Sequence, residues 1–348
     1  MSYYYEYELG KAAKILCEDL FKLKPGETIV ITADTESDDR VVNATARAAF
    51  ACDAKPMVIY TASPLGVGKA ADPMLPVKAL AAALVETDVW IEYNNQWLLY
   101  STAYDIAKAK NPKLRYLNAC GMNASMMVRL IGRVDFLTLE KFLNHLVKIT
   151  KNAKHIRVTT PAGTDVEFDN DPEHPVLIRG GQFDVPGSHM QPGMIAWAPD
   201  LETINGAIVF DGSIVPPIVG VLGEPVVLHI KNGMIVKIEG GKEATEYENW
   251  LKSFNHSQMF KLAHISYGLH PNARLSGDIV EDERIWGATE WGIGNVGVHL
   301  VSGGIDGPSH SDGICLNSSV WLDGVQITDK GQLLDPELKK LAEKLGKV

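Results

Sequence analysis

The chain has 348 residues, of which 46% are hydrophobic and 22% are charged, and its formal net charge is -10. This length exceeds what one compact core usually serves, so we expect two domains, and the composition is that of a globular protein. The acidic balance disfavours nucleic acid and anionic membranes as partners, because both need a basic surface.

The sequence shows no targeting or membrane-spanning signal. Its start lacks a basic segment followed by an apolar core, and no stretch approaches the ~18 uninterrupted apolar residues of a membrane span. The cysteines are far apart and form no CxxC pair; they are Cys17, Cys52, Cys120 and Cys315. We therefore expect reduced thiols, no zinc–thiolate site, and a cytoplasmic protein without a membrane partner.

Residues 1–153 alternate between helical and strand patterns. Apolar residues at helical spacing predict helices over 8–23, 38–54, 76–87, 98–110 and 124–153, with Gly132 as a candidate break in the last. Short apolar runs predict strands over 25–33, 55–62, 88–94 and 113–120. Strand–helix alternation of this kind predicts an α/β domain whose parallel sheet is covered on both faces.

Residues 154–348 have a different pattern. Segments 155–169 and 224–241 each predict a strand, a turn and a strand, and Asn232-Gly233 is a two-residue hairpin signal. Helices are expected only at 244–254 and 336–348. We therefore expect a C-terminal metal-binding domain that is mainly antiparallel β (α+β), joined to the N-terminal α/β domain.

His310 and Asp312 stand two residues apart in a segment with strand character, GPSHSDGICL (307–316). Side chains at i and i+2 of a strand point the same way, so the imidazole and the carboxylate can meet at one metal ion. An H-x-D pair also arises by chance, and the alternative is a surface pair or a hydrogen-bonded turn.

Two neighbouring segments supply further candidates. His264 lies in an apolar setting and is either a ligand or a buried neutral histidine. In the acidic run that follows, Glu281 and Glu283 read as a solvated face, whereas Glu290 precedes Trp291 and is expected to point inward. Nitrogen and oxygen donors suit iron, manganese or zinc, and two histidines with one carboxylate form the non-haem Fe(II) arrangement, which leaves positions for a chelating substrate and O₂.

The runs HISYGLHPNAR, GPSHSD and VWLDG, all within 261–324, resemble the 2,5-dihydroxypyridine 5,6-dioxygenase family. These are mononuclear Fe(II) ring-cleaving enzymes, related in fold to aminopeptidase T (M29-type) and leucyl aminopeptidase-like proteins. The resemblance implies Fe(II), alternatively Zn or Mn, on His264, His310 and Asp312. It also implies a homo-oligomer whose partners are O₂ and a hydroxylated, N-heteroaromatic small molecule.

This chain departs from the peptidase-like relatives at two positions. They carry Glu within AELGIGLNPNA, where this chain has His264, and His within GTVHIALG, where it has Glu290. Relative to the two-metal hydrolase pattern, the carboxylate and the imidazole have changed places, and the resemblance therefore favours one metal ion over two. It leaves Glu290 as an extra ligand or as a base beside the metal.

It departs from the dioxygenase pattern in a segment that reads Leu-Leu-His-Ser in the family and LLYS here. Tyr100 stands where the family has an acid–base histidine. A tyrosine with a pKa near 10 is a poorer base than histidine at neutral pH, but it can hydrogen-bond a substrate oxygen. The substrate can therefore differ from dihydroxypyridine. His189, in the segment 184–197, is a candidate for contacting the substrate; the alternative is an exposed loop histidine.

Two other functions remain open at this point. A metal-dependent hydrolase, either aminopeptidase-like or opening a ring amide, would use a metal-activated water with Glu290 or Glu283 as base. A non-enzymatic binding protein on the same fold would need none of these side chains for its function.

Overall fold

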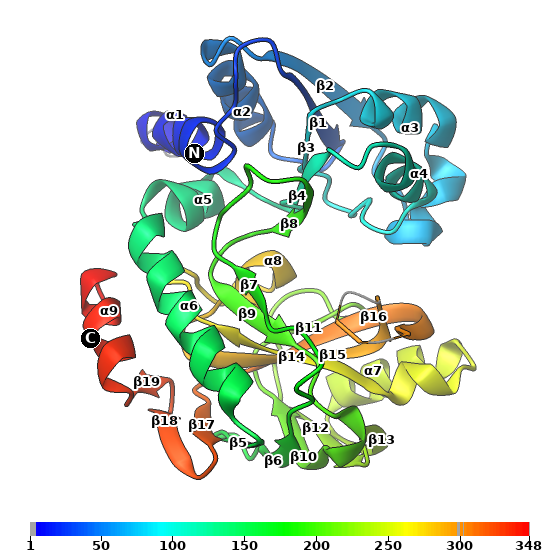
Figure 1. Cartoon of the computed structure of the whole chain (residues 1–348). Coiled ribbons are helices and arrows are strands. Elements are labelled where there is room, and N and C mark those ends of the chain that lie inside the picture. The colour runs from blue at the N-terminus through cyan, green and yellow to red at the C-terminus, as the bar shows by residue number, and fades with distance from the viewer. Residues whose placement is uncertain (1–4, 298–299, 302, 348) are drawn as a thin grey trace. The chain divides into compact units, whose positions relative to one another are not determined.

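The computed structural model of the chain describes residues 5–297, 300–301 and 303–347. The chain divides into two compact units, Met1–Val134 with Gly181–Pro192, and Asp135–Gly180 with Gly193–Val348. The predicted fold class is confirmed, since the first unit holds a parallel sheet and the second holds antiparallel sheets (Figure 1). The predicted boundary after residue 153 differs from this division, because only the second part of the helix predicted over 124–153 belongs to the second unit, and residues 181–192 belong to the first.

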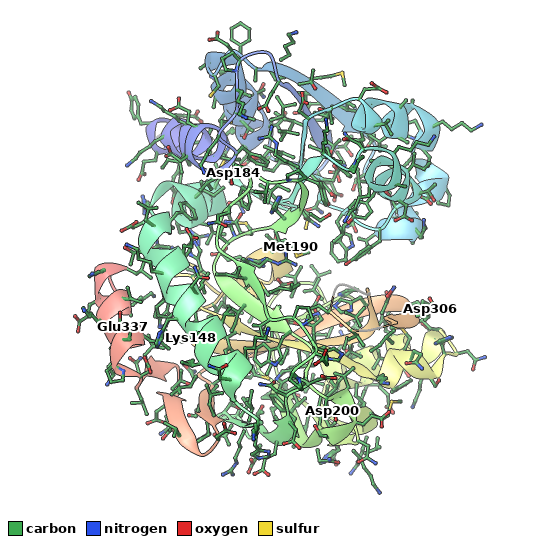
Figure 2. The ribbon with its side chains drawn as sticks, in the orientation of Figure 1. Lys148, Asp184, Met190, Asp200, Asp306 and Glu337 are labelled. Atoms are coloured by element: carbon green, nitrogen blue, oxygen red, sulfur yellow. The ribbon has the colours of Figure 1, made fainter. Side chains whose placement is uncertain are left out.

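The first unit is built on a five-stranded sheet in the order β2-β1-β3-β4-β8. All neighbouring strands pair in parallel. The strands are β1 (Thr28–Asp34), β2 (Lys55–Thr61), β3 (Val89–Glu92), β4 (Arg115–Asn118) and β8 (Gly187–Met190). The first four were predicted. β8, which ends at Met190 (Figure 2), arrives from a remote segment and pairs with β4, and this pairing is why residues 181–192 join this unit.

Helices lie on both sides of this sheet, as the alternating pattern predicts. Figure 1 shows α1, α2 and α5 on one side of the strands and α3 and α4 on the other. The bounds are α1 (Tyr5–Lys14) with a π-helical continuation (Ile15–Leu20), α2 (Asp39–Ala51), a 3-10 turn (Gly68–Met74), α3 (Val77–Val85), α4 (Thr102–Lys110) and α5 (Ala124–Met127) with a π-helical continuation (Val128–Gly132).

The predicted break at Gly132 is confirmed. The helical path ends there, and α6 (Phe136–Asn152) begins a new helix. Asp135 caps α6, because its side chain accepts hydrogen bonds from the N–H groups of Leu137 and Thr138. The long predicted helix is therefore two helices, and they belong to different units.

The second unit contains two antiparallel sheets. The eight-stranded sheet has the order β13-β12-β10-β6-β5-β17-β18-β19, and the six-stranded sheet has the order β11-β16-β15-β14-β9-β7. The former comprises β5 (His155–Thr159), β6 (Asp165–Asp169), β10 (Asn205–Phe210), β12 (Val226–Lys231), β13 (Met234–Gly240), β17 (Ser319–Leu322), β18 (Val325–Asp329) and β19 (Gln332–Leu333). The latter comprises β7 (Leu177–Arg179), β9 (Met194–Trp197), β11 (Ile214–Val215), β14 (Leu262–Gly268), β15 (Ala288–Val296) and β16 (Ile305–Cys315).

Both predicted hairpins are confirmed, as β5–β6 and β12–β13. Asn232 and Gly233 both have positive φ, of 50° and 71°, as the two-residue turn requires. The remaining helices are α7 (Lys242–Ser253), α8 (Ile279–Asp282), α9 (Pro336–Lys344) and short 3-10 turns (Leu201–Thr203, Ser257–Phe260). Val348, the end of the predicted last helix, lies outside the described residues. Over the described ranges, we find no helix with both the length and the apolar character that a membrane crossing demands.

The two sheets of the second unit pack through their inner faces. The rings of Phe168 on β6 and Trp291 on β15 meet edge to face with centroids 5.7 Å apart. A Cβ atom on Gly313 of β16 would lie only 2.2 Å from the ring of Phe210 on β10. Because side chains alternate along a strand, the neighbours of Trp291 and Gly313 point to the opposite face of the six-stranded sheet.

Glu92 places a carboxyl group in the core of the first unit. Its side chain is fully buried and accepts hydrogen bonds from the Tyr116 hydroxyl and from the N–H of Leu98. Burial raises the pKa of Glu92 to about 7, in spite of these two bonds. The first unit therefore folds around a carboxyl group that keeps its proton well into the neutral range.

We expect the stability of the first unit to fall as the pH rises. Folded Glu92 holds its proton up to about pH 7, whereas the unfolded side chain loses it near 4.5. The free energy of unfolding is therefore highest below about pH 4.5. It falls between pH 4.5 and 7, by about 3 kcal/mol in all, and the loss is complete once the pH has passed 7. Hydrogen exchange of the β3 amides between pH 4.5 and 7.5 measures this loss.

The Glu92→Gln variant should flatten that dependence, because glutamine does not titrate. Glu86→Gln, a change at an exposed carboxylate of the same unit, is the matched control and should keep the wild-type slope. Equal slopes in wild type and Glu92→Gln would contradict the assignment to Glu92.

Candidate metal centre

Three side chains from two strands converge on the outer face of the six-stranded sheet. The register places His264 of β14 opposite Gly292 of β15, and Gly292 opposite Asp312 of β16. His310 precedes Asp312 by two residues and points to the same face. This is the face turned away from the eight-stranded sheet. Figure 2 marks Asp306 at the start of β16, which carries two of the three side chains.

The donor atoms of these side chains form a small triangle. His264 Nε2 lies 3.2 Å from His310 Nε2 and 3.6 Å from Asp312 Oδ1, and His310 Nε2 lies 2.9 Å from Asp312 Oδ1. Two ligand atoms about 2.1 Å from one ion, at 90–110° to each other, are about 3.0–3.4 Å apart. The triangle therefore has the size of one face of a coordination polyhedron, and its donors fit one divalent ion.

Gly292 makes this convergence sterically possible. A Cβ atom at this position would lie 2.4 Å from His264 Nε2 and 2.7 Å from its Cε1. The imidazole of His264 thus lies across the backbone of Gly292, between β14 and Asp312 on β16. The sequence analysis missed Gly292, because only the pairing of the strands shows that it faces His264.

Asp312 and His310 stabilise each other's charged forms. Burial alone would raise the pKa of Asp312, but the adjacent His310 imidazolium lowers it to about 2. Burial would lower the pKa of His310, and the Asp312 carboxylate outweighs it, so that the pKa is raised. The pair therefore favours one positive charge beside the carboxylate. A divalent ion on the same atoms would replace that proton.

Glu290 lies beside the triangle and is buried as predicted, with 1% of its surface exposed. Its Oε2 accepts a hydrogen bond from Ser266 Oγ and lies 3.5 Å from His264 Nδ1, while His264 Nε2 faces the triangle. Burial, together with the charges of Asp312 and Glu283, raises the pKa of Glu290 well above its usual value. The Glu290 carboxyl group thus binds its proton more tightly than an exposed glutamate does, and it lies behind the His264 ring, on the Nδ1 side.

The acidic run after β14 is not the predicted solvated face. Glu281 is fully buried and accepts a hydrogen bond of 2.8 Å from the Arg274 N–H. Glu283 is 15% exposed and pairs with Arg284 at 2.7 Å. Burial outweighs the arginine and raises the pKa of Glu283 to about 7. The prediction was wrong because a backbone N–H group and the buried guanidinium of Arg284 satisfy these carboxylates. The local charge pattern shows neither the hydrogen bond to the backbone nor the burial of the arginine.

The other two predicted residues lie in the first unit. His189 is half-buried on β8, and its Nε2 lies 2.8 Å from the Val185 carbonyl oxygen, so it is not an exposed loop residue. Tyr100 is 44% exposed and has a φ of 67°, a region that non-glycine residues seldom adopt. The triangle lies in the second unit, so the roles of His189 and Tyr100 stay predictions.

Comparison with known proteins identifies the family. Residues 16–335 match the family model of the 2,5-dihydroxypyridine 5,6-dioxygenases. The chain belongs to this family. A curated 2,5-dihydroxypyridine 5,6-dioxygenase from Pseudomonas putida KT2440 is 27% identical over 202 residues, which are 54% of this chain and 57% of that protein. The aligned part therefore spans little more than half the length of that relative.

Two solved structures share the fold of this dioxygenase-family chain. One is 2,5-dihydroxypyridine dioxygenase from Pseudomonas putida KT2440, with a TM-score of 0.77 and 20% identity over 96% of this chain and 99% of that one. The other is wild-type AmpT from Thermus thermophilus, with a TM-score of 0.68 and 15% identity over 95% and 100% of the two chains. The family resemblance seen in the sequence is thus confirmed.

A methyl group at position 292 should disrupt the centre. We expect Gly292→Ala to displace the His264 ring and to lower affinity for a divalent metal by at least about 100-fold, as loss of one ligand's position does. Metal content after dialysis against a weak chelator measures this loss.

Ile293→Val is the control, because Ile293 is fully buried on the opposite face of β15 and the change costs about 1 kcal/mol of packing. This variant should lose stability yet keep its metal. Full metal retention by Gly292→Ala would refute the steric role of Gly292.

Proposed function

We propose that this protein is a ring-cleaving dioxygenase that binds one Fe(II) ion through His264, His310 and Asp312 and acts with O₂ on a hydroxylated N-heteroaromatic ring. The triangle of two imidazole nitrogens and one carboxylate oxygen, all within 3.6 Å, is the observation that carries the proposal. Family membership supports the reaction class. The predicted homo-oligomer and cytoplasmic location stay predictions.

Among the residues that the structure describes, the three donors lie together on one side of the site. His264, His310 and Asp312 would hold the ion through three donor atoms, which would leave positions for a chelating substrate and for dioxygen. The bound iron supplies the chemistry of electron exchange between an electron-rich ring and dioxygen. Two neutral imidazoles and a single carboxylate leave one net positive charge on a divalent ion, and this charge favours substrates that bind as phenolate-type anions.

Residues around the triangle handle protons and orientation. The pKa of Glu290 is raised by burial and by the charge of Asp312, and its carboxyl group lies 3.5 Å from His264 Nδ1, so it can release or take up a proton beside the ligands without changing the donor set. The sequence-based roles of His189 and Tyr100 in contacting substrate oxygens stay predictions.

A metal-dependent hydrolase is the second candidate. The carboxyl groups of Glu283 and Glu290 both have raised pKa values and lie within electrostatic reach of Asp312, and a general base for water needs such a pKa. The fold shared with AmpT is compatible with hydrolysis but does not decide the reaction, because function depends on the site.

Anaerobic metal analysis, followed by O₂ consumption on a panel of hydroxypyridines and catechols, tests the proposal. We expect one iron per chain, one O₂ consumed per ring cleaved, and no turnover by protein loaded with zinc. His310→Ala and Asp312→Asn should each lose bound iron and lower the rate by at least about 1,000-fold, because each removes one ligand.

Asp306→Asn is the matched control, since Asp306 is an exposed carboxylate on the same strand, and it should keep iron and activity. Turnover of an amide or peptide by zinc- or manganese-loaded protein without O₂ would assign the hydrolase instead. Absence of iron and of O₂ uptake with every ring in the panel would refute the dioxygenase.

A further inference from the structure

The row of side chains that builds the centre continues onto a fourth strand. Val215 of β11 pairs directly with Asp312, and Ile214 pairs with Gly313. Residues directly opposite in an antiparallel pair share a face, with Cβ atoms about 4.5–5.5 Å apart. Val215 therefore lies on the face of His264 and Asp312, next to the carboxylate, and its isopropyl group is half-buried.

The segment that follows Val215 is held against the sheet at its edge. Ser311 Oγ donates a hydrogen bond of 2.6 Å to the carbonyl oxygen of Pro216. The N–H of Leu222 donates a bond of 2.9 Å to the Gly212 carbonyl oxygen. These two contacts close residues 212–222 into a compact loop whose first part follows β16 beside the triangle.

A buried carboxylate fixes the base of this loop. Asp282 is fully buried and accepts hydrogen bonds from Ser213 Oγ (2.7 Å), the Ser276 N–H (2.8 Å) and the Gly277 N–H (2.9 Å). It thus joins the start of the loop to the segment after β14. Burial raises the pKa of Asp282, and these donors oppose that shift.

The loop tip is fixed as well. A Cβ atom on Gly277 would lie 2.3 Å from the Cα atom of Gly220, so the two backbones are in direct contact. The loop is therefore held at its base, at Pro216 and at its tip. A side chain supported in this way keeps its place when a ligand packs against it.

We propose that Val215 determines specificity at this centre, with one face of the substrate ring packing on its isopropyl group while the ring oxygens reach the metal. This inference rests on the proposed function for the identity of the substrate. The Val215 side chain has no hydrogen-bonding group. This side of the site therefore favours a substrate with an apolar ring face over one that carries a polar side chain there.

Ligand binding to zinc-loaded protein tests the role of Val215 without turnover. The probe is 4-nitrocatechol, a chelating ring whose absorbance shifts when it binds a metal. Val215→Ala removes two methyl groups and should raise its Kd about 5- to 10-fold, and Val215→Thr, of similar shape but polar, should raise it about 3-fold. Zinc content should stay at the wild-type level in both variants.

Two controls separate ring packing from effects on the metal. Acetohydroxamate chelates zinc but has no ring, so its Kd, measured by calorimetry, should be the same in wild type and both variants. Val236→Thr makes the same change at an exposed position on β13 and should leave both Kd values unchanged.

An unchanged Kd for 4-nitrocatechol in the Val215 variants would overturn the proposal. Equal weakening of both chelators, or loss of zinc, would also overturn it, because Val215 would then act on the metal rather than on the ring. The dioxygenase is tested separately by O₂ uptake with iron. If the Val215 variants weaken 4-nitrocatechol binding but the iron-loaded wild type consumes no O₂, the dioxygenase reaction is refuted. The role of Val215 in binding the ring would still stand.

Discussion

The centre depends on a space left open in one strand. His264 and Asp312 lie two strands apart, and they meet only because Gly292, between them, has no side chain to separate them. With any larger residue there, the imidazole would be pushed off the sheet and the triangle would open. The close packing of rings on the inner face prevents the strands from moving to compensate, since interiors have little free volume.

Electrostatics imposes a second constraint on the same face. Asp312, Glu283 and Glu290 are brought close together in a poorly hydrated region, where three negative charges cannot coexist. The chain meets this constraint by raising the pKa of Glu290 and by placing His310 beside Asp312. A bound cation meets it better, because it adds two positive charges at the point where the donor atoms converge. The carboxyl groups thus favour a cation at this point.

The fold itself does not select between oxygenase and hydrolase chemistry. It is shared with a dihydroxypyridine dioxygenase and with AmpT, at sequence identities of 20% and 15%. The chemistry depends instead on the residues on the outer face of the six-stranded sheet. His264 and Glu290 occupy neighbouring positions on β14 and β15, and Val215 adds an apolar group to the same row. Under the proposed function, reaction and substrate are decided at these positions, on a scaffold that permits several outcomes.

The sequence by itself determined the features that follow from local periodicity. The parallel α/β unit, the break at Gly132, the hairpin at Asn232-Gly233 and the common face of His310 and Asp312 are readable because each depends on residues close together in the chain. Only the tertiary structure decided the rest: β8 in the first sheet, Gly292 beneath His264, the burial of Glu281, and Val215 beside Asp312. The strand features depend on register between distant segments, and a shift of one residue would turn each side chain to the other face. The burial of Glu281 depends on how helix α8 packs, with the Arg274 N–H as its hydrogen-bond donor.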